Sequence, residues 1–209
     1  MIRPAPLTYS QPLAQSEEDQ ARLRAELGET GFAPFCGTIT GAPLDFLYQE
    51  SVRQFTTAHL AIGNELLQYR SRLASLGPIG EGFLLSEPLG SLLYSAFGQR
   101  YRLSPQSSCY TYYREGDFLA AHRDDADGCS VTVLVYLVAE SPHPELPESG
   151  LYLDIFQDDN DRPGNRLCRI QTMAGGVVIG RGSQVWHARN PLLRQERVDL
   201  LAACFTPAV

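Results

Sequence analysis

The tripeptide His122-Arg123-Asp124 combines two side chains that could bind one metal ion. On an extended strand, residues two apart point to the same face, so the imidazole of His122 and the carboxylate of Asp124 could converge. The tripeptide is also common by chance, since a histidine that ends a strand before a turn-capping aspartate has the same form. The pattern becomes informative only if a further ligand lies elsewhere in the chain.

His187 could be that further ligand. It is one of four histidines and lies between apolar neighbours in the run Val185-Trp186-His187-Ala188. Taken alone, it is a core histidine bonded to the backbone. Together with His122 and Asp124 on strands of one β-rich segment, it can complete a 2-His-1-carboxylate triad, which holds Fe(II) on one face and leaves the other positions open.

Arg197 begins an otherwise apolar strand-like run one hairpin after His187. Arginine in such a run is costly unless its guanidinium meets an anion, and a carboxylate bound through two hydrogen bonds is its best partner. The anion could be a carboxylate of the protein. It could also be the distal carboxylate of a dicarboxylate cosubstrate that chelates the metal at its other end.

The residues after Arg102 must position these side chains, and they read as short strands separated by turn sequences. The expected strands are SSCYTYYRE, DFLAAH, CSVTVLVYLV, GLYLDIF, RLCRIQT, GGVVIG, SQVWHAR and RVDLLAACF. With no helical pattern between them, they predict an antiparallel sandwich or barrel. We predict an α+β protein, mainly β, with a double-stranded β-helix core of the jelly-roll or cupin type.

The N-terminal half is predicted to supply supporting helices. Residues 1–16 read as an extended arm, and a helix should begin after Ser16 and end at Gly28. GFAPFCGTI should be a short strand, residues 43–73 one or two helices, GPIGEG a glycine-rich link, and residues 88–97 a last short helix. One domain over residues 1–209 is expected, with arm and helices in 1–102 and the β-core in 103–209.

Charge and composition exclude several function classes. The net charge is −7, the basic residues are dispersed, and all 17 of them are arginines. Neither nucleic acid nor a membrane surface is therefore an expected partner, and a lysine Schiff base is excluded. Aspartates 124, 125 and 127 with Gly128 resemble part of a calcium loop, but the later ligands are missing.

The five cysteines are Cys36, Cys109, Cys129, Cys168 and Cys204, and they form no CxxC pair. An odd number of widely spaced cysteines favours reduced, mostly buried thiols over thiolate-bound zinc. The N-terminal residues have no apolar core of signal-peptide length. These features predict a cytoplasmic protein.

The segment from Tyr113 to Asp124 resembles a known family. It follows the Tyr-x-x-Gly-(x)5-His-x-Asp pattern of the 2-oxoglutarate- and iron(II)-dependent oxygenases, particularly their prolyl-hydroxylase-like branch. Val131-Thr132, Tyr136-Leu137, His187 and Arg197 extend the resemblance over about residues 105–206. Residues 27–55 are similar to the N-terminal segment of isopenicillin-N-synthase-like oxygenases.

The resemblance implies an enzyme that uses Fe(II), 2-oxoglutarate and O₂, and releases succinate and CO₂. The implied iron ligands are His122, Asp124 and His187. Arg197 would hold the distal carboxylate of 2-oxoglutarate, and the hydroxyls of Tyr136 and Tyr113 would donate hydrogen bonds to it. The expected reaction is hydroxylation, or another oxidation at an unactivated C–H bond, of a small-molecule or amino-acid-like substrate.

Two alternatives and two departures from the family pattern stay open. The alternatives are a peptidyl-prolyl hydroxylase and a cupin-like metal protein that does not use 2-oxoglutarate. Leu119 stands where the family often has a second tyrosine, and Asp199 stands where it often has a small residue. On a regular strand Asp199 shares the face of Arg197 and would repel an anion, unless a twist turns it aside or another arginine such as Arg189 pairs with it. The oligomeric state is not predicted.

Overall fold

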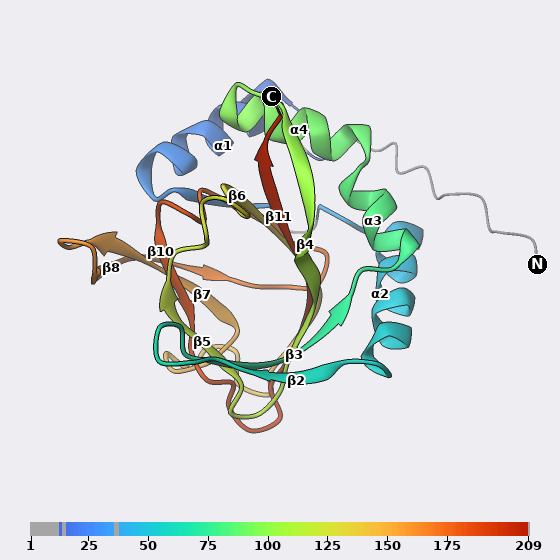
Figure 1. The fold of residues 1–209 in the computed structure, drawn as a ribbon, viewed down its shortest axis with the longest axis vertical. Helices are drawn as coiled ribbons and strands as arrows, with labels where there is room; N and C mark the ends of the chain where they lie inside the picture. The colour runs from blue at the N-terminus through green and yellow to red at the C-terminus, as the bar shows by residue number, and fades with distance from the viewer. Residues whose placement is uncertain (1–12, 14–15, 36–37, 209) are drawn as a thin grey trace, which may run out of the picture.

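The computed structural model of the protein describes residue 13, residues 16–35 and residues 38–208. The predicted arm, apart from Leu13 and Ser16, and Cys36 therefore lie outside the described residues. Strands dominate what is described, and they form a strongly curled sheet (Figure 1). The prediction of a mainly β protein is confirmed.

The strands form one curled sheet in the order β1-β9-β6-β11-β4-β3-β5-β10-β7-β8, with β2 paired to β3. Every pairing between these strands is antiparallel. The strands are β1 (Phe32–Phe35), β2 (His59–Ile62), β3 (Tyr69–Ser75), β4 (Tyr101–Tyr113), β5 (Phe118–His122), β6 (Val131–Glu140), β7 (Tyr152–Asp158), β8 (Pro163–Gln171), β9 (Val177–Gly180), β10 (Trp186–Arg189) and β11 (Arg197–Pro207). Strands β4 to β11 match the strands predicted after Arg102, and their arrangement is the double-stranded β-helix.

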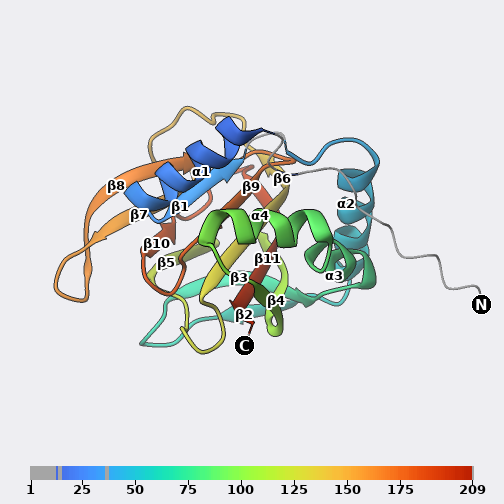
Figure 2. The ribbon, with the colours of Figure 1, turned by 90° about the horizontal axis from the view of Figure 1, so that it is seen from above.

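The helices lie outside the curled sheet (Figure 2). They are α1 (Glu17–Glu29), α2 (Ala42–Phe55), α3 (Pro78–Leu84) and α4 (Glu87–Phe97). Their apolar residues, such as Leu23, Leu47 and Leu92, form one core cluster with Val133 and Ile179 on the outer side of the sheet. A second cluster, which includes Tyr136, Leu153 and Leu200, lies on the inner side of the sheet. No helix among the described residues is long and apolar enough to cross a membrane.

The N-terminal half also contributes strands, which the sequence patterns predicted only in part. The helix after Ser16 is present, capped by a reciprocal bond pair with Asp19, although it continues past Gly28 to Glu29. The prediction of helix for residues 43–73 is wrong after Phe55, because β2 and β3 form a hairpin there. Asn64 closes its turn by accepting the backbone N–H groups of Leu66 and Leu67.

The glycine-rich stretch GPIGEG is helix α3 and not a link, so this prediction is wrong. The buried carboxylate of Glu50 accepts the backbone N–H groups of Ile79 (2.8 Å) and Gly80 (2.7 Å) at the start of α3. Glu50 also accepts the hydroxyl of Tyr110 at 2.7 Å. A Cβ at Gly77 would collide with the Glu50 carboxylate, and one at Gly80 would collide with the Tyr110 hydroxyl that donates to it, so both glycines make room for the group that satisfies the helix N-terminus.

Replacing Glu50 by alanine is expected to lower the free energy of unfolding by at least about 3 kcal/mol, because two buried donors and one partly buried donor lose their acceptor. Urea denaturation followed by circular dichroism measures this change. Tyr110→Phe removes only one of the three bonds and should cost about 1 kcal/mol. Equal losses in the two variants would contradict the capping role of Glu50.

Two of the five cysteines form a disulfide, which corrects the prediction of reduced thiols. Cys129 is bonded to Cys204 across a sequence separation of 75 residues. Antiparallel pairing of β6 with β11 sets Cys204 opposite Thr132 and so brings the two sulfurs together. Cys109 and Cys168 are free and only partly buried. The spacing of the cysteines along the chain does not indicate which of them form the disulfide.

Candidate active site

A cavity of about 330 Å³ lies inside the curled sheet. His122, Asp124 and His187 line it, and so do Tyr113 and Tyr136. The structure therefore brings together five of the six residues predicted to form the site. Arg197 is not among the described residues that line this cavity.

Strand pairing fixes the two histidines next to each other. His122 ends β5 and lies directly opposite His187 of β10 in the antiparallel register. Directly opposed residues point to the same side of a sheet, and the two imidazole centroids are 4.2 Å apart. Asp124 follows two residues after His122, and its Oδ1 lies 3.2 Å from Nε2 of His122 and 3.8 Å from Nε2 of His187.

The backbone orients both imidazoles for metal binding. Nδ1 of His122 lies 3.1 Å from the carbonyl oxygen of Ala120, and Nδ1 of His187 lies 3.0 Å from that of Val185. A neutral imidazole whose Nδ1–H donates to a carbonyl offers the lone pair of Nε2 to a cation, and such a bond fixes both ring orientation and tautomer. The Nε2 atoms are the ones that face Asp124.

Two neighbours hold the carboxylate of Asp124. The hydroxyl of Thr132 on β6 donates to Oδ2, which leaves Oδ1 toward the histidines. The backbone N–H of Asp124 donates to the carbonyl oxygen of Gly182 at 2.9 Å. Gly182 packs so closely that a Cβ there would collide with the Asp124 carboxylate and the Thr132 hydroxyl. Thr132 and Gly182 therefore both confine Oδ2 of the carboxylate.

The protonation states of this cluster suit a cation. Burial, together with repulsion from His122, lowers the pKa of His187 to about 4, so its imidazole is neutral near pH 7. Burial on its own would raise the pKa of Asp124, but hydrogen bonding to His122 and the nearby imidazoles outweigh it and lower that pKa. One anionic oxygen thus faces two imidazole nitrogens.

These residues fit a divalent transition metal. One ligand atom from each of His122, Asp124 and His187 can be chosen so that all three lie within 4.8 Å of one another. Two imidazoles and one carboxylate on one side of an open cavity are the donor set of non-haem Fe(II) oxygenases. The acidic stretch after Asp124 forms a turn, in which the main-chain carbonyl oxygen of Asp125 accepts the backbone N–H groups of Gly128 and Cys129.

Arg189 is a buried cation in the same cavity. It lies two residues after His187 on β10, and its side chain shares the cavity-facing side of that strand. Its guanidinium donates to the carbonyl oxygen of Gly150 and to the hydroxyl of Tyr136, at 2.9 Å for the latter. It also stacks on the rings of Tyr113 and Tyr136.

All these partners of Arg189 are neutral, and among the described residues its guanidinium has no carboxylate partner. Buried charges in proteins are almost always paired, because an unpaired charge loses its hydration without compensation. The guanidinium has five donors and matches a carboxylate through two of them. The structure therefore offers an anion site at Arg189, on the cavity that also holds the metal ligands.

Arg197 points to the opposite side of its strand, which corrects the predicted anchor. Val198 and Leu200 belong to the interior cluster, so Arg197 and Asp199 face outward by strand alternation. Nε of Arg197 donates to Asp199 at 3.0 Å, and Arg114 donates to the other oxygen of Asp199. This pairing helps to raise the pKa of Arg197 against the effect of burial. Asp199 therefore pairs with Arg114 and Arg197, and not with Arg189.

The two predicted tyrosines line the cavity beside Arg189. Tyr136 is fully buried on β6 and accepts the bond from Arg189, while Tyr113 at the end of β4 packs beneath the same guanidinium. Burial raises the pKa of both phenols, so both hydroxyls stay protonated and can donate. Leu119 lines the cavity and adds no polar contact there.

Some residues of the site were missed in the sequence. The sequence patterns indicate Arg189 only as a possible partner of Asp199, yet its spacing of two from His187 is a signal that places both side chains on one face of a strand. Thr132 was part of the matched pattern without a role. The cavity wall formed by Leu67, Tyr69 and Leu73 could not be found, because the hairpin β2–β3 was taken for helix.

No protein-family profile and no curated protein matches this sequence. Solved structures do match its fold over most of the chain. A prolyl-4-hydroxylase from Pseudomonas putida has 18% sequence identity and a TM-score of 0.65, covering 90% of this chain and all of that one. The epimerase SnoN of nogalamycin biosynthesis, described as non-haem and alpha-ketoglutarate-dependent, has 15% identity and a TM-score of 0.72, covering 92% of this chain and 82% of that one.

HygX from Streptomyces hygroscopicus, solved with nickel, 2-oxoglutarate and hygromycin B bound, matches with 15% identity and a TM-score of 0.66. That match covers 93% of this chain and 88% of that one. SnoN has also been solved in complex with Fe³⁺, alpha-ketoglutarate and nogalamycin RO. At these identities the likeness shows that the chain has the double-stranded β-helix fold of these enzymes.

Proposed function

We propose that this protein is a non-haem Fe(II)- and 2-oxoglutarate-dependent dioxygenase that oxidises an unactivated C–H bond of a small molecule. The observation that carries the proposal is the pairing of two sites in one cavity. A His-Asp-His triad suited to Fe(II) lies in the same cavity as a buried arginine with only neutral partners. A dicarboxylate that chelates the metal at one end and meets the arginine at the other satisfies both.

Each residue then has a defined task. His122, Asp124 and His187 would hold Fe(II), which with 2-oxoglutarate and O₂ supplies the oxidation and leaves succinate and CO₂. Arg189 binds the distal carboxylate of 2-oxoglutarate through its guanidinium, in place of Arg197. The hydroxyl of Tyr136 donates to the same carboxylate, and its raised pKa keeps it a donor.

A small-molecule substrate is favoured by the size of the cavity and by the apolar wall beside the triad. The hairpin β2–β3 adds Leu67, Tyr69 and Leu73 to the cavity, whose volume of about 330 Å³ is typical of small-ligand sites. SnoN and HygX, which share the fold, were solved with nogalamycin RO and hygromycin B bound. We transfer from them the class of substrate, a compact organic molecule, and not its identity.

A peptidyl-prolyl hydroxylase is the second candidate, favoured by the fold likeness to the Pseudomonas putida prolyl-4-hydroxylase. Succinate release measured against matched panels of small molecules and proline-containing peptides separates the two. The charge of Asp199 beside Arg197 was the main reason to consider a cupin-like protein that does not use 2-oxoglutarate. Asp199 lies outside the cavity and is paired with two arginines, so it no longer supports that alternative.

The proposal is tested by anaerobic reconstitution with Fe(II) and 2-oxoglutarate. Wild-type protein is expected to show a visible metal-to-ligand charge-transfer band, and 2-oxoglutarate should raise the melting temperature of the metal-bound protein. His187→Ala should show neither effect. A wild-type protein with no band and no stabilisation by 2-oxoglutarate would exclude the dioxygenase.

We keep the cytoplasm as the proposed compartment. Fractionation of cells that express the natural protein, followed by immunodetection, tests this. Detection outside the cytoplasmic fraction would contradict the proposal. In a reducing compartment, disulfides of mesophilic proteins are usually transient and redox-responsive.

A further inference from the structure

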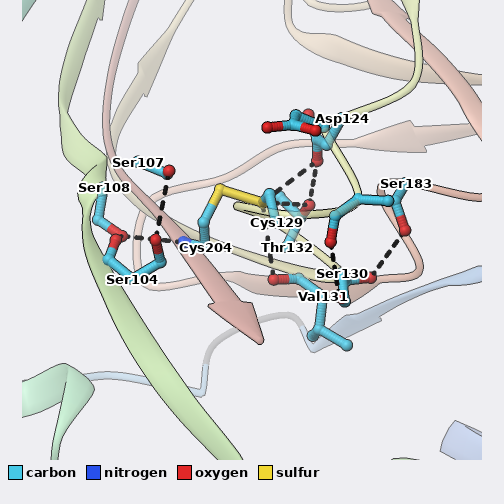
Figure 3. Close-up of a disulfide and its surroundings, with 12 residues drawn as sticks. Ser104, Ser107, Ser108, Asp124, Cys129, Ser130, Val131, Thr132, Ser183 and Cys204 are labelled. Atoms are coloured by element: carbon cyan, nitrogen blue, oxygen red, sulfur yellow. Dashed lines mark hydrogen bonds between the residues drawn. A yellow bond between two sulfur atoms is a disulfide. The ribbon is translucent and has the colours of Figure 1, made fainter. Parts of the chain in front are cut away.

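The Cys129–Cys204 disulfide lies in the wall of the cavity, beside the metal ligand Asp124 (Figure 3). Cys129 is buried just before β6, and Cys204 is a partly buried residue of β11 that lines the cavity. The proposed function gives neither sulfur a task. Their position next to a metal ligand is therefore unexplained.

The contacts of Cys129 converge on one oxygen of Asp124. Its Sγ lies 3.6 Å from Oδ2 of Asp124 and 3.5 Å from the hydroxyl oxygen of Thr132. The same Thr132 hydroxyl donates to that Oδ2 (Figure 3). The oxygen that faces away from the histidines is thus enclosed by a hydroxyl and a disulfide sulfur.

The disulfide also ties down the segment that carries Asp124. Between Asp124 and Cys129 the chain makes a tight turn, in which Asp125 accepts the backbone N–H of Cys129 at 2.7 Å. One end of this segment is bonded to Gly182 through the Asp124 backbone, and the other is bonded covalently to β11. Breaking the covalent bond leaves only hydrogen bonds to hold the turn.

Reduction of the disulfide would change the hydrogen bonding around the Asp124 carboxylate as well as the attachment of the segment that carries Asp124. A disulfide sulfur carries no proton, so it cannot compete with Thr132 as a donor to Oδ2. A Cys129 thiol can donate there and so compete with Thr132 for the same carboxylate oxygen. Non-bonded sulfurs also need more separation than bonded ones.

We propose that Cys129 and Cys204 are redox-sensitive positioning residues of the metal site, whose disulfide holds Asp124 in its ligating position and whose reduction weakens divalent-metal binding. The co-reactant is a small dithiol. It gives two electrons and two protons to the Cys129–Cys204 bond, which becomes two thiols, and is itself oxidised to a cyclic disulfide. The inference rests on the metal site of the proposed function and adds a control to it.

The test measures Co(II) affinity of the full chain, anaerobically, in the oxidised and reduced states. Co(II) is chosen because its visible absorption reports both binding and sulfur ligation. Differential alkylation and mass spectrometry of the Cys129 and Cys204 peptides verify each state after the dithiol is removed. The oxidised protein is expected to bind Co(II) at least about tenfold more tightly, the usual scale for losing an outer partner of a metal ligand.

Variants separate positioning from general stability. Cys109 lines the same cavity but contacts Thr111, so Cys109→Ser should keep the redox dependence. The double variant Cys129→Ser, Cys204→Ser should lose it. Cys204→Ser leaves a thiol beside Asp124 and is expected to bind Co(II) more weakly than Cys129→Ser, which leaves none there. A purely structural disulfide would lower the melting temperature of the metal-free protein without changing Co(II) affinity.

Affinities equal within twofold in the two redox states would overturn the inference and leave the dioxygenase standing. Tighter binding by the reduced protein would overturn it too, as would failure of the disulfide to form in the presence of oxidised glutathione. Absence of Co(II) binding in both states, as expected for His187→Ala, would instead overturn the metal site on which both proposals rest.

Discussion

Arg189→Gln is expected to weaken 2-oxoglutarate binding by about a hundred- to a few-thousand-fold while leaving metal binding intact. Removing one partner of a buried charge pair costs about 3–5 kcal/mol, and each 1.4 kcal/mol is a factor of ten in the dissociation constant. Glutamine keeps a donor for Tyr136 but supplies no charge to a carboxylate. Titration of the anaerobic Fe(II) protein with 2-oxoglutarate, followed by the charge-transfer band, measures the change.

The stability of the metal-free Arg189→Gln protein is the second part of this prediction. In the ligand-free chain the guanidinium is buried among neutral partners, which is an electrostatic cost. Its removal is therefore expected to change the melting temperature little, or to raise it. A large drop in stability together with unchanged 2-oxoglutarate binding would mean that Arg189 is a structural residue.

Arg197→Gln is the matched control. It removes one of the two arginines bonded to Asp199 and leaves Arg114 in place. We expect a modest loss of stability, about 1–2 kcal/mol, because Asp199 is buried. Binding of 2-oxoglutarate should stay within about threefold of the wild type, a difference of less than 1 kcal/mol. Loss of cosubstrate binding in this variant alone would restore the anchor predicted from the sequence.

Gly182→Ala is expected to weaken Fe(II) or Co(II) binding by about 10- to 100-fold, the range found when the outer partners of a metal ligand are lost. A methyl group at this position would collide with the Asp124 carboxylate and the Thr132 hydroxyl. The carboxylate must turn away, since the Gly182 backbone itself is held by the bond from Asp124. Anaerobic metal titration of the purified variant measures the loss.

Gly90→Ala is the control for this substitution. Gly90 lies in α4, and a Cβ there would meet nothing within 4 Å. Alanine also favours the helix, so this variant should be as stable as the wild type or more stable, with unchanged metal affinity. If Gly182→Ala binds metal like the wild type, the close contact with Asp124 does not position the ligand.

The approach of Asp124 to His122 was predictable because it is local. An extended chain turns residues two apart to the same side, and Asp124 follows this rule although it lies just past the end of β5 at His122. The same rule links His187 to Arg189, so the buried arginine was also within reach of sequence reasoning. The family pattern indicates Arg197 instead, because that pattern places its arginine on the next strand.

The face on which Arg197 lies was not predictable, because it depends on one residue of register. The turn between β10 and β11 includes Gln195, which has a positive φ of 66°. One residue more or fewer in that turn would exchange the inward and outward sides of β11. The residue types in the turn do not reveal how many residues separate the two strands. The position of Asp199, two residues after Arg197, did correctly indicate a conflict with an anion at Arg197.

The disulfide and the hairpin β2–β3 depend on contacts between distant segments. Cys129 and Cys204 meet only because β6 pairs with β11 in one particular register. The stretch containing β3 has apolar residues at spacings that also suit a helix, and its pairing with β4 and β5 decides in favour of strand. Local patterns carry no information about either partner.

The hairpin β2–β3 and the His-Asp-His triad line the same cavity from distant parts of the chain. Leu67, Tyr69 and Leu73 reach the cavity from one contiguous hairpin, whereas the metal ligands follow or lie on β5 and β10. Because β3 is paired with both β4 and β5, only substitutions that keep this pairing would reshape the cavity wall without moving His122. Under the proposed function, substrate choice would then be encoded far upstream in the chain from the residues of the triad.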